Sequence, residues 1–340
     1  MDKPTLQNSA NNAIVNCMEL VPTDRLVIIT DQETLEIGQA LLTEAQKITS
    51  STLLLKIEDY GTRPMQSFPN KLEQDIKTFN PNCSIYAAQG KEGELPKFRS
   101  KLIDLLAYQL NCAHAHMIAI TKEIMLDGMD TDYGKLYDIT QKIYNICKTA
   151  KEIKVTNNKG TDVTAKLSPK LNWVSSHGKI KLSEGKSWQN LPGTETFTSP
   201  ESVDGTVVAE ILGDYFSEKY GQLTHPVTFK LKDGFCYNLT CQDKNLEQEL
   251  KLYMFTSPLG NRVGEFAIGT NIGLKKFIGN LLQDEKYPGM HMAFGHPYPK
   301  ETGADWDSPT HLDVIPTGVD IFIDGKQIMK KGKFDMTSLA

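Results

Sequence analysis

The residues from Gly264 to Asp313 carry the strongest structural signal in this chain. They contain G-E-F-A-I-G-T-N, then L-L-Q-D-E-K-Y-P-G-M-H-M-A-F-G-H-P-Y-P, and then T-H-L-D-V. The functional groups that we single out among these short apolar runs and glycines are carboxylates, imidazoles and a phenol: Glu265, Asp284, Glu285, His291, His296, Tyr298, His311 and Asp313. Imidazole together with carboxylate suits zinc, cobalt, manganese or non-haem iron. We therefore expect this segment to build a metal site.

The pair His311 and Asp313 gives the clearest local geometry. The segment T-H-L-D-V-I is rich in β-forming residues, which predicts a strand. Residues two apart on a strand point to the same side, so these two side chains would face one cavity while Leu312 and Val314 face the other way. Taken alone, such a pair more often lies on a strand that faces water.

His291 strengthens the metal interpretation. It lies in the alternating run M-H-M-A-F-G, which has the character of a buried strand. A single buried histidine usually only forms a hydrogen bond within the core. Two such histidines, with several carboxylates close in the sequence, make metal ligation the better hypothesis.

Other segments share this character and together resemble a known enzyme family. The matching segments are N-L-P-G-T-E-T-F-T-S-P (residues 190–200), V-D-G-T-V (residues 203–207), G-E-F-A-I-G-T-N, L-Q-D-E-K, H-M-A-F-G-H-P-Y, T-H-L-D-V and I-D-G-K. In them the chain resembles the metallo-aminopeptidases of the aminopeptidase T and aminopeptidase S type, a group of thermophilic metalloproteases and leucyl aminopeptidases. The resemblance is specific over the C-terminal half and weak over the N-terminal half.

The resemblance implies which side chains hold metal. Carried over residue by residue, the ligands of the family fall on positions of the expected type and order: Glu195, Glu265, His291, Tyr298, His311 and Asp313. The dimers that are common in this family imply a homodimer.

Three departures from the family pattern mark this chain as similar to a short-form branch. Gly193 and Thr194 precede Glu195, where the family usually carries two acidic residues. The D-E-N segment of the family reads D-E-K at residues 284–286. The loop between His291 and His311 is short. Peptidase activity in such a branch is therefore an expectation that needs its own test.

The residue types predict two ions and a hydrolytic reaction. A carboxylate can bridge two cations whereas an imidazole binds one, and several carboxylates with two histidines suit a dinuclear centre better than a structural zinc site. Two divalent ions (zinc, cobalt or manganese) could activate a water molecule and polarise a peptide carbonyl. They could also receive the free α-amine of a peptide substrate, which would restrict cleavage to the N-terminal bond.

Individual roles follow from this hypothesis. Glu195 and Asp313 would be shared ligands, and Tyr298 a ligand or a donor to the developing oxyanion. Glu285 is the candidate general base by position. Its charged neighbours at positions 284 and 286 favour a solvated helix end instead.

Two alternatives remain open at this level. His291, His311 and Asp313 could form the facial triad of a mononuclear non-haem iron enzyme, as in dioxygenases that cleave hydroxylated pyridine rings. The two extra carboxylates, Glu195 and Glu265, favour the hydrolase because an iron triad does not need them. The chain could also be a non-catalytic dimeric binding module with a relic site, which the retention of all ligands argues against.

The first half of the chain alternates strands and helices, which predicts a parallel sheet covered by helices. We expect strands at residues 25–30, 52–57, 83–88 and 116–120, and helices at residues 33–48, 96–110 and 133–150. No glycine-rich phosphate-binding turn follows the first strand, so nucleotide binding is disfavoured. His114 and His116 share a face of the fourth strand without acidic partners, and we interpret them as structural.

The pattern changes near residue 151 to short segments broken by glycine and proline. Asp233-Gly234 and Asp324-Gly325 predict two tight β-hairpins. Helices are expected at residues 245–255 and 272–282. We therefore predict an α/β sheet domain over residues 1–152. A metal-binding catalytic domain, rich in antiparallel strands that form a partly closed barrel, follows over residues 153–340.

The composition of the chain bears on its partners, on membrane insertion and on the state of its cysteines. The net charge of −5 carries no basic stripe, so nucleic acid is an unexpected partner. No apolar run is long enough to cross a bilayer, and the polar N-terminus has no signal-peptide pattern. The six cysteines form no C-x-x-C pair and suit free core thiols in a reducing cytoplasm.

Overall fold

The computed structural model describes residues 4–182 and 188–337. Contacts divide the chain into two compact units, each built from several segments. The first unit comprises Met1–Tyr137, Ser176–Gly193 and Gly273–Lys275. The second comprises Asp138–Ser175, Thr194–Ile272 and Lys276–Ala340. The boundary predicted at residues 152/153 stays a prediction.

A five-stranded parallel sheet forms the centre of the first unit. Its order is β2-β1-β3-β4-β8, and the strands are β1 (Leu26–Thr30), β2 (Thr52–Lys56), β3 (Cys83–Ala88), β4 (Ala113–Ile118) and β8 (Trp188–Asn190). All five residues of β1 and all six of β3 are buried, as expected for central parallel strands. The predicted α/β character of this half is confirmed.

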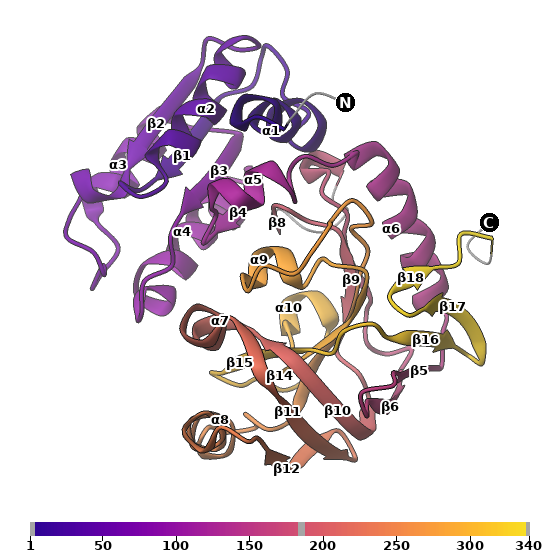
Figure 1. Cartoon of the computed structure of the whole chain (residues 1–340). Helices are drawn as coiled ribbons and strands as arrows, with labels where there is room; N and C mark the ends of the chain where they lie inside the picture. Colours follow the sequence, from indigo (N-terminus) through magenta and orange to yellow (C-terminus); the bar gives the residue numbers. More distant parts are fainter. Residues whose placement is uncertain (1–3, 183–187, 338–340) are drawn as a thin grey trace. The chain divides into compact units, whose positions relative to one another are not determined.

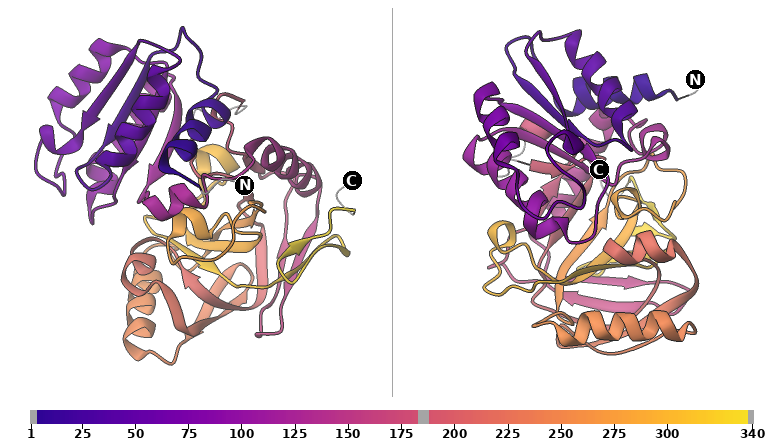
Figure 2. Two further views of the ribbon diagram at one scale, coloured as in Figure 1. Left: turned by 45° about the horizontal axis from the view of Figure 1, so that its top comes forward. Right: turned by 90° about the vertical axis from the view of Figure 1, so that its left-hand side faces the viewer.

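Helices cover both faces of this sheet (Figures 1 and 2). They are α1 (Leu6–Asn12), α2 (Leu35–Gln46), α3 (Asn70–Phe79), α4 (Ser100–Ile103) and α5 (Lys122–Leu126), with π-helical turns at Ala13–Cys17, Leu95–Arg99 and Asp104–Gln109. Val27 and Ile29 pack with Leu72 of α3 and Leu102 of α4 in one apolar cluster. Ile28 points the other way, toward α2, because side chains alternate along a strand.

A long curled antiparallel sheet forms the second unit, in the order β18-β17-β16-β5-β6-β10-β15-β14-β13-β9-β7, with β11 and β12 attached beside β10. The strands are β5 (Glu152–Thr156), β6 (Asp162–Lys166), β7 (Val174–Ser176), β9 (Glu195–Thr198), β10 (Ser202–Leu212), β11 (Gln222–Lys232), β12 (Phe235–Thr240), β13 (Val263–Gly269), β14 (Gly289–Gly295), β15 (His311–Ile315), β16 (Asp320–Ile323), β17 (Lys326–Lys330) and β18 (Lys333–Phe334). This confirms the predicted antiparallel half-barrel.

Both predicted hairpins are present. Asp233 and Gly234 join β11 to β12, and Asp324 and Gly325 join β16 to β17. All four residues have positive φ, between 47° and 81°, which is the geometry that a two-residue hairpin turn requires. The sequence signal was reliable here because Asp-Gly adopts this backbone at low cost.

The helices of the second unit are α6 (Tyr133–Cys147, which continues from the first unit), α7 (Asp214–Tyr220), α8 (Lys244–Thr256), α9 (Leu281–Asp284) and α10 (Pro299–Thr302). Figure 1 shows α8 beside β12. The predicted helix at residues 272–282 is wrong. Ile278 and Gly279 instead donate their backbone amides to the Asp284 carboxylate, and Gly279 has a φ of +75° that no regular helix accepts.

The six cysteines are all buried and free, as the sequence predicts. Among the described residues no helix is both long enough and apolar enough to cross a membrane.

Candidate metal centre

Four neighbouring strands, in the order β9, β13, β14, β15, carry five of the six predicted ligands. His291 of β14 lies opposite Ala267 of β13. Ala293 of β14 lies opposite both Glu265 of β13 and Asp313 of β15. Glu265, Ala293 and Asp313 therefore form one row across three strands. Backbone pairing thus brings residues far apart in the sequence to one small area.

The opposite face of the same strands fixes the direction of the ligands. Phe266, Met292 and Val314 are fully buried in the apolar core of this unit. Because side chains alternate along a strand, the adjacent predicted ligands must point away from that core. The small side chains of Ala267 and Ala293 lie on the ligand face and leave room there.

Glu195 and His311 complete this face from its two ends. Glu195 begins β9 opposite Gly269 of β13, and its side chain is only 7% exposed. His311 begins β15 opposite Gly295 of β14. The predicted strand at T-H-L-D-V is thus confirmed, and Leu312 is fully buried in the core on its other face.

Neighbouring donor atoms on this face lie 3.4–3.6 Å from one another. His291 Nε2 lies 3.4 Å from Glu195 Oε2 and 3.6 Å from Glu265 Oε1. His311 Nε2 lies 3.6 Å from Glu265 Oε2 and 3.5 Å from Asp313 Oδ2. Four tetrahedral ligands held 2.0–2.2 Å from one ion are about 3.3–3.6 Å apart. These separations therefore fit ligands around ions better than hydrogen-bond partners.

Three sets of donors among the described residues could each hold an ion, with their donor atoms within 4.8 Å of one another. They are Glu195 with Glu265 and His291, Glu265 with His311 and Asp313, and Glu285 with His291 and Asp313. Three donor atoms of these sets, Glu195 Oε2, His291 Nε2 and Asp313 Oδ2, are buried without a hydrogen-bond partner. Buried polar atoms are seldom left unsatisfied, so a cation fits this arrangement.

The carboxylates dominate the electrostatics of both histidines. Burial by itself lowers the pKa of His291, but the carboxylates of Glu195 and Glu265 outweigh it and raise that pKa to about 10. Burial likewise opposes the charge on His311, and Asp313 with Glu265 raises the pKa of His311 to about 10. A face that favours protonation of these two imidazoles so strongly also favours divalent cations.

Backbone contacts orient His311. Its Nδ1 lies 3.2 Å from the carbonyl oxygen of His296, which leaves Nε2 directed at Glu265 and Asp313. A ring nitrogen that donates to a carbonyl leaves a lone pair on the other nitrogen, as metal-binding histidines require. The His296 side chain instead contacts Asp307, at 2.5 Å, and is 35% exposed.

Tyr298 lies beside this face in a left-handed backbone conformation, with φ of +52°. The centroid of its ring lies 5.3 Å from the centroid of the His311 ring and 5.4 Å from that of the Phe197 ring. Burial, followed by the charges of Glu265 and Asp313, raises the pKa of its hydroxyl well above the ordinary value. The hydroxyl is therefore a protonated donor unless a cation binds next to it.

Asp284 and Lys286 are buried and Glu285 is largely so, and the predicted solvated helix end is therefore wrong. Lys286 is fully buried, and its Nζ lies 2.5 Å from Glu195 Oε1 and 2.6 Å from Glu285 Oε1. The Glu285 side chain is 11% exposed. Asp284 is 1% exposed because it accepts the loop amides described above. Sequence reasoning missed Lys286, although the D-E-K departure from the family's D-E-N segment marked its position.

The two carboxylate partners of Lys286 have very different pKa values. Burial opposes ionisation of Glu195, but Lys286 and His291 outweigh it and lower the pKa of Glu195 to about 2. Burial raises the pKa of Glu285 to about 8, against the opposing charge of Lys286 and together with repulsion from Glu195 and Asp313. A carboxylate with a pKa near neutrality can accept and return a proton, as general-base catalysis needs.

A glycine behind Asp313 gives a way to test this geometry. A Cβ on Gly213 would lie 2.6 Å from the Asp313 Cβ and 2.7 Å from its Oδ2. We expect Gly213→Ala to displace this carboxylate and to weaken metal binding by about 10- to 100-fold, the usual effect of disturbing a ligand's support. Calorimetric titration with Mn²⁺ measures the change. Gly289→Ala is the control, because its Cβ meets no atom closer than 3.8 Å. Equal affinities in both variants would contradict the placement of Asp313.

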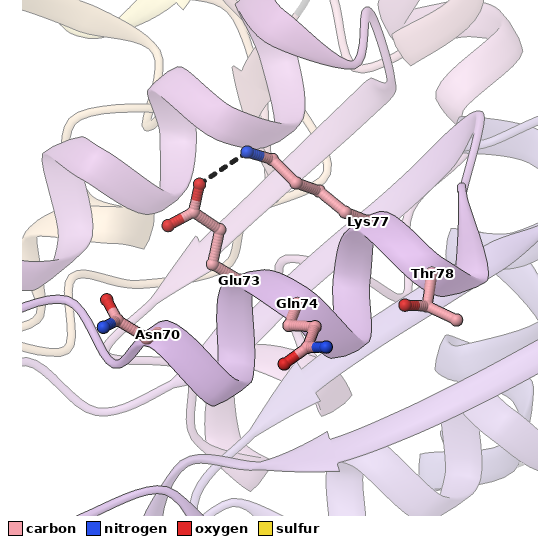
Figure 3. A pocket seen from close by; sticks show the side chains of 5 residues that line it. All are labelled: Asn70, Glu73, Gln74, Lys77 and Thr78. Atoms are coloured by element: carbon pink, nitrogen blue, oxygen red, sulfur yellow. Dashed lines mark hydrogen bonds and ion pairs between the residues drawn. The ribbon is translucent and has the colours of Figure 1, made fainter.

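A surface hollow in the first unit has a different character. It measures about 390 Å³ along α3 and is lined by Asn70, Glu73, Gln74, Lys77 and Thr78 (Figure 3). Lys77 Nζ contacts Glu73 Oε1 at 2.6 Å across its lining. None of the predicted ligands lines it, and its polar groups are those of an ordinary exposed helix.

Comparisons with known proteins agree with this arrangement. A family model for M29 peptidases, described as thermophilic metalloproteases, matches residues 132–316, more than half of the 340 residues. The fold is similar to that of 2,5-dihydroxypyridine dioxygenase from Pseudomonas putida KT2440, with 15% identity, 98% coverage of each chain and a TM-score of 0.68. It is similar to wild-type AmpT from Thermus thermophilus, with 16% identity, coverage of 97% of this chain and 98% of that chain, and a TM-score of 0.67. No curated protein sequence matches the chain significantly.

Proposed function

This chain belongs to the M29 family of thermophilic metalloproteases, and we propose that it is a metal-dependent aminopeptidase that hydrolyses the N-terminal bond of peptides. The family confirms the resemblance expected from the sequence motifs. The observation that carries the proposal is the pair of donor sets that meet at Glu265. His291 lies at one oxygen of that carboxylate and is itself close to Glu195. His311 lies at the other oxygen and is close to Asp313.

Two divalent ions fit this pattern. Glu195 and His291 would hold one ion, His311 and Asp313 would hold the other, and Glu265 would contribute to both. The sequence had suggested Glu195 as a shared ligand, but one of its two oxygens is held by Lys286. Glu265 has one oxygen 3.6 Å from His291 Nε2 and the other 3.6 Å from His311 Nε2, so it suits the shared position better. Zinc, cobalt and manganese all accept such a mixture of oxygen and nitrogen donors.

The remaining groups have roles that follow from their protonation. Bound ions would activate a water molecule and polarise the scissile carbonyl. Glu285, with its raised pKa, would take the proton from that water and return it to the leaving amine. Tyr298, with its raised pKa, would donate to the oxyanion or complete a ligand set. Glu195 would act at the reaction centre through its metal-facing oxygen.

The rest of the proposal comes from the sequence. We place catalysis in residues 153–340 and propose a homodimer in the cytoplasm. The proposed substrate is a peptide with a free N-terminus, without a nucleic-acid or membrane partner.

The fold similarity to 2,5-dihydroxypyridine dioxygenase supports an alternative function, that of a ring-cleaving dioxygenase. A mononuclear iron enzyme would use His291, His311 and Asp313 as its triad. Among the described residues no donor set joins both imidazoles, and each set contains a glutamate. This distribution favours the hydrolase. Non-catalytic binding would leave the unpartnered donor atoms unexplained.

An assay on paired dipeptides tests the function. Purified protein, freed of metal and then supplied with Zn²⁺, Co²⁺ or Mn²⁺, is given each dipeptide with a free and with an acetylated N-terminus. We expect hydrolysis of the free form only. Cleavage of neither form, together with oxygen-dependent consumption of a hydroxylated pyridine in the presence of Fe²⁺, would replace the proposal by the dioxygenase alternative.

Removal of metal provides a prediction about stability. A ligand that binds only the folded state raises the free energy of unfolding, by about 2.7 kcal/mol when its concentration is 100 times Kd. We therefore expect a chelator to lower the Tm by several degrees and added Mn²⁺ to restore it. Thermal unfolding followed by circular dichroism measures the shift. A Tm that does not respond to either treatment would show that no bound ion stabilises the fold.

A further inference from the structure

Among the described residues, Lys286 is a cation that contacts the donor sets directly, through two carboxylates. Its side chain is fully buried, and its ammonium lies 2.5 Å from Glu195 Oε1 and 2.6 Å from Glu285 Oε1. A buried ammonium is costly unless it is paired and hydrogen-bonded. These two carboxylates supply that pairing.

The backbone holds Lys286 in place from both sides. Its N–H donates to the carbonyl of Gln283 at 3.0 Å, and its carbonyl accepts the N–H of Asn271 at 2.9 Å. The backbone of Lys286 is therefore held between α9 and the residues that follow β13. Its ammonium is held separately, by Glu195 and Glu285.

The ammonium of Lys286 occupies one of the two oxygens of Glu195 and leaves the other for a metal ion. Oε1 contacts Lys286, whereas Oε2 is buried, has no hydrogen-bond partner and lies 3.4 Å from His291 Nε2. Only Oε2 is free to face a metal. Among the described residues, the donor sets of this centre include the carboxylates of Glu195, Glu265, Glu285 and Asp313. When ionised they repel one another, and Lys286 is a fixed positive charge that reduces this repulsion before any metal arrives.

We propose that Lys286 is an internal cation of the metal centre, a positioning residue that holds Glu195 to one metal-facing oxygen, stabilises the metal-free fold and weakens the binding of divalent ions. This inference rests on the proposed metal-dependent function and deepens it. A permanent positive charge next to the donor atoms repels an incoming metal ion. The same charge reduces the repulsion among the carboxylates, which the metal ion would otherwise have to neutralise. The centre is therefore stable without metal and releases its ions more readily than the carboxylates alone would.

The sign of the effect on metal affinity tests the proposal. Lys286→Met keeps much of the side-chain volume and removes the charge. Calorimetric titration with Mn²⁺ should show at least tenfold tighter binding in this variant, about 1.4 kcal/mol. The Tm without metal should fall, and the increase in Tm on adding Mn²⁺ should exceed that of the wild type. A residue with only a packing role would lower both Tm values equally and leave the affinity unchanged or weaker, which would overturn the inference.

A charge-balanced variant covers the case in which Lys286→Met does not fold. Glu285→Gln/Lys286→Met removes one negative and one positive charge, so its Mn²⁺ affinity should return to within a few-fold of the wild-type value. Tenfold weaker binding in this double variant would also overturn the inference. Lys251→Met is the matched control, because Lys251 forms a 2.5 Å ion pair with Glu247 on exposed α8, outside the centre. Its Mn²⁺ affinity should not change.

The same titrations separate the two proposals. A wild-type protein that binds no divalent ion at all would refute the proposed function and this inference with it. A wild-type protein that binds Mn²⁺ and hydrolyses free dipeptides, with an affinity that Lys286→Met does not tighten, would refute this inference alone.

Discussion

Glu265→Gln should abolish tight binding of both ions and lower kcat/KM for dipeptide hydrolysis by at least about 10³-fold, or about 4 kcal/mol of transition-state stabilisation. The Glu265 carboxylate places one oxygen 3.6 Å from His291 Nε2 and the other 3.6 Å from His311 Nε2. Glutamine keeps the shape but replaces one oxygen by an amide nitrogen that cannot bind a cation. Elemental analysis and dipeptide kinetics measure the two effects.

Two further variants make this result specific. Glu195→Gln removes a ligand from only one donor set, so it should lose one ion and keep the other. Glu152→Gln changes an exposed glutamate on β5 of the same sheet and should bind metal and hydrolyse dipeptides like the wild type. Two bound ions in Glu265→Gln would exclude Glu265 as the shared ligand. Loss of both ions in Glu195→Gln would move the shared role to Glu195.

Acid should destabilise the parallel-sheet unit through two buried histidines. His114 Nδ1 lies 2.9 Å from Ser84 Oγ, and His114 Nε2 lies 3.1 Å from His116 Nδ1. In such a pair one nitrogen donates and the other accepts, so the two rings cannot both be protonated without losing this hydrogen bond. Burial lowers the pKa of His114 to about 3, and burial together with the charge of His114 lowers the pKa of His116 well below its ordinary value.

The direction of the pH effect follows from these depressed values. In the unfolded chain both histidines titrate near pH 6.5, so between about pH 3 and pH 6.5 the unfolded state binds more protons than the folded state. The unfolding free energy is therefore complete above about pH 6.5 and falls as the pH decreases. Each histidine contributes a slope of up to about 1.4 kcal/mol per pH unit. Denaturant unfolding of metal-free protein between pH 4 and pH 6.5 measures the slope.

Variants identify the source of this slope. The double variant His114→Leu/His116→Phe should unfold with a clearly shallower pH dependence over that range, whatever its absolute stability. His225→Gln, at an exposed position on β11, should keep the wild-type slope. His291 and His311 have raised pKa values, so their contribution changes between about pH 6.5 and pH 10 and does not overlap this window. An unchanged slope in the double variant would show that the two histidines are not the acid-sensitive groups.

The sequence by itself determined the parts of this protein that depend on neighbouring residues. Alternation along T-H-L-D-V and M-H-M-A-F-G is a local property, and it correctly predicted strands with their apolar side chains in the core. The two Asp-Gly turns were equally local, because their positive φ values depend on two residues. The family motifs also lie within short segments, so the M29 membership was visible without coordinates.

Only the tertiary structure decided how those segments meet. The sequence at residues 284–286 reads as a charged helix end, yet packing buries Lys286 against Glu195, which lies 91 residues earlier. It likewise predicted a helix at residues 272–282, where the Asp284 carboxylate instead accepts loop amides. The position of Glu265 between both histidines depends on strand register across β13, β14 and β15. Register and burial arise from contacts between distant segments, and local periodicity cannot encode them.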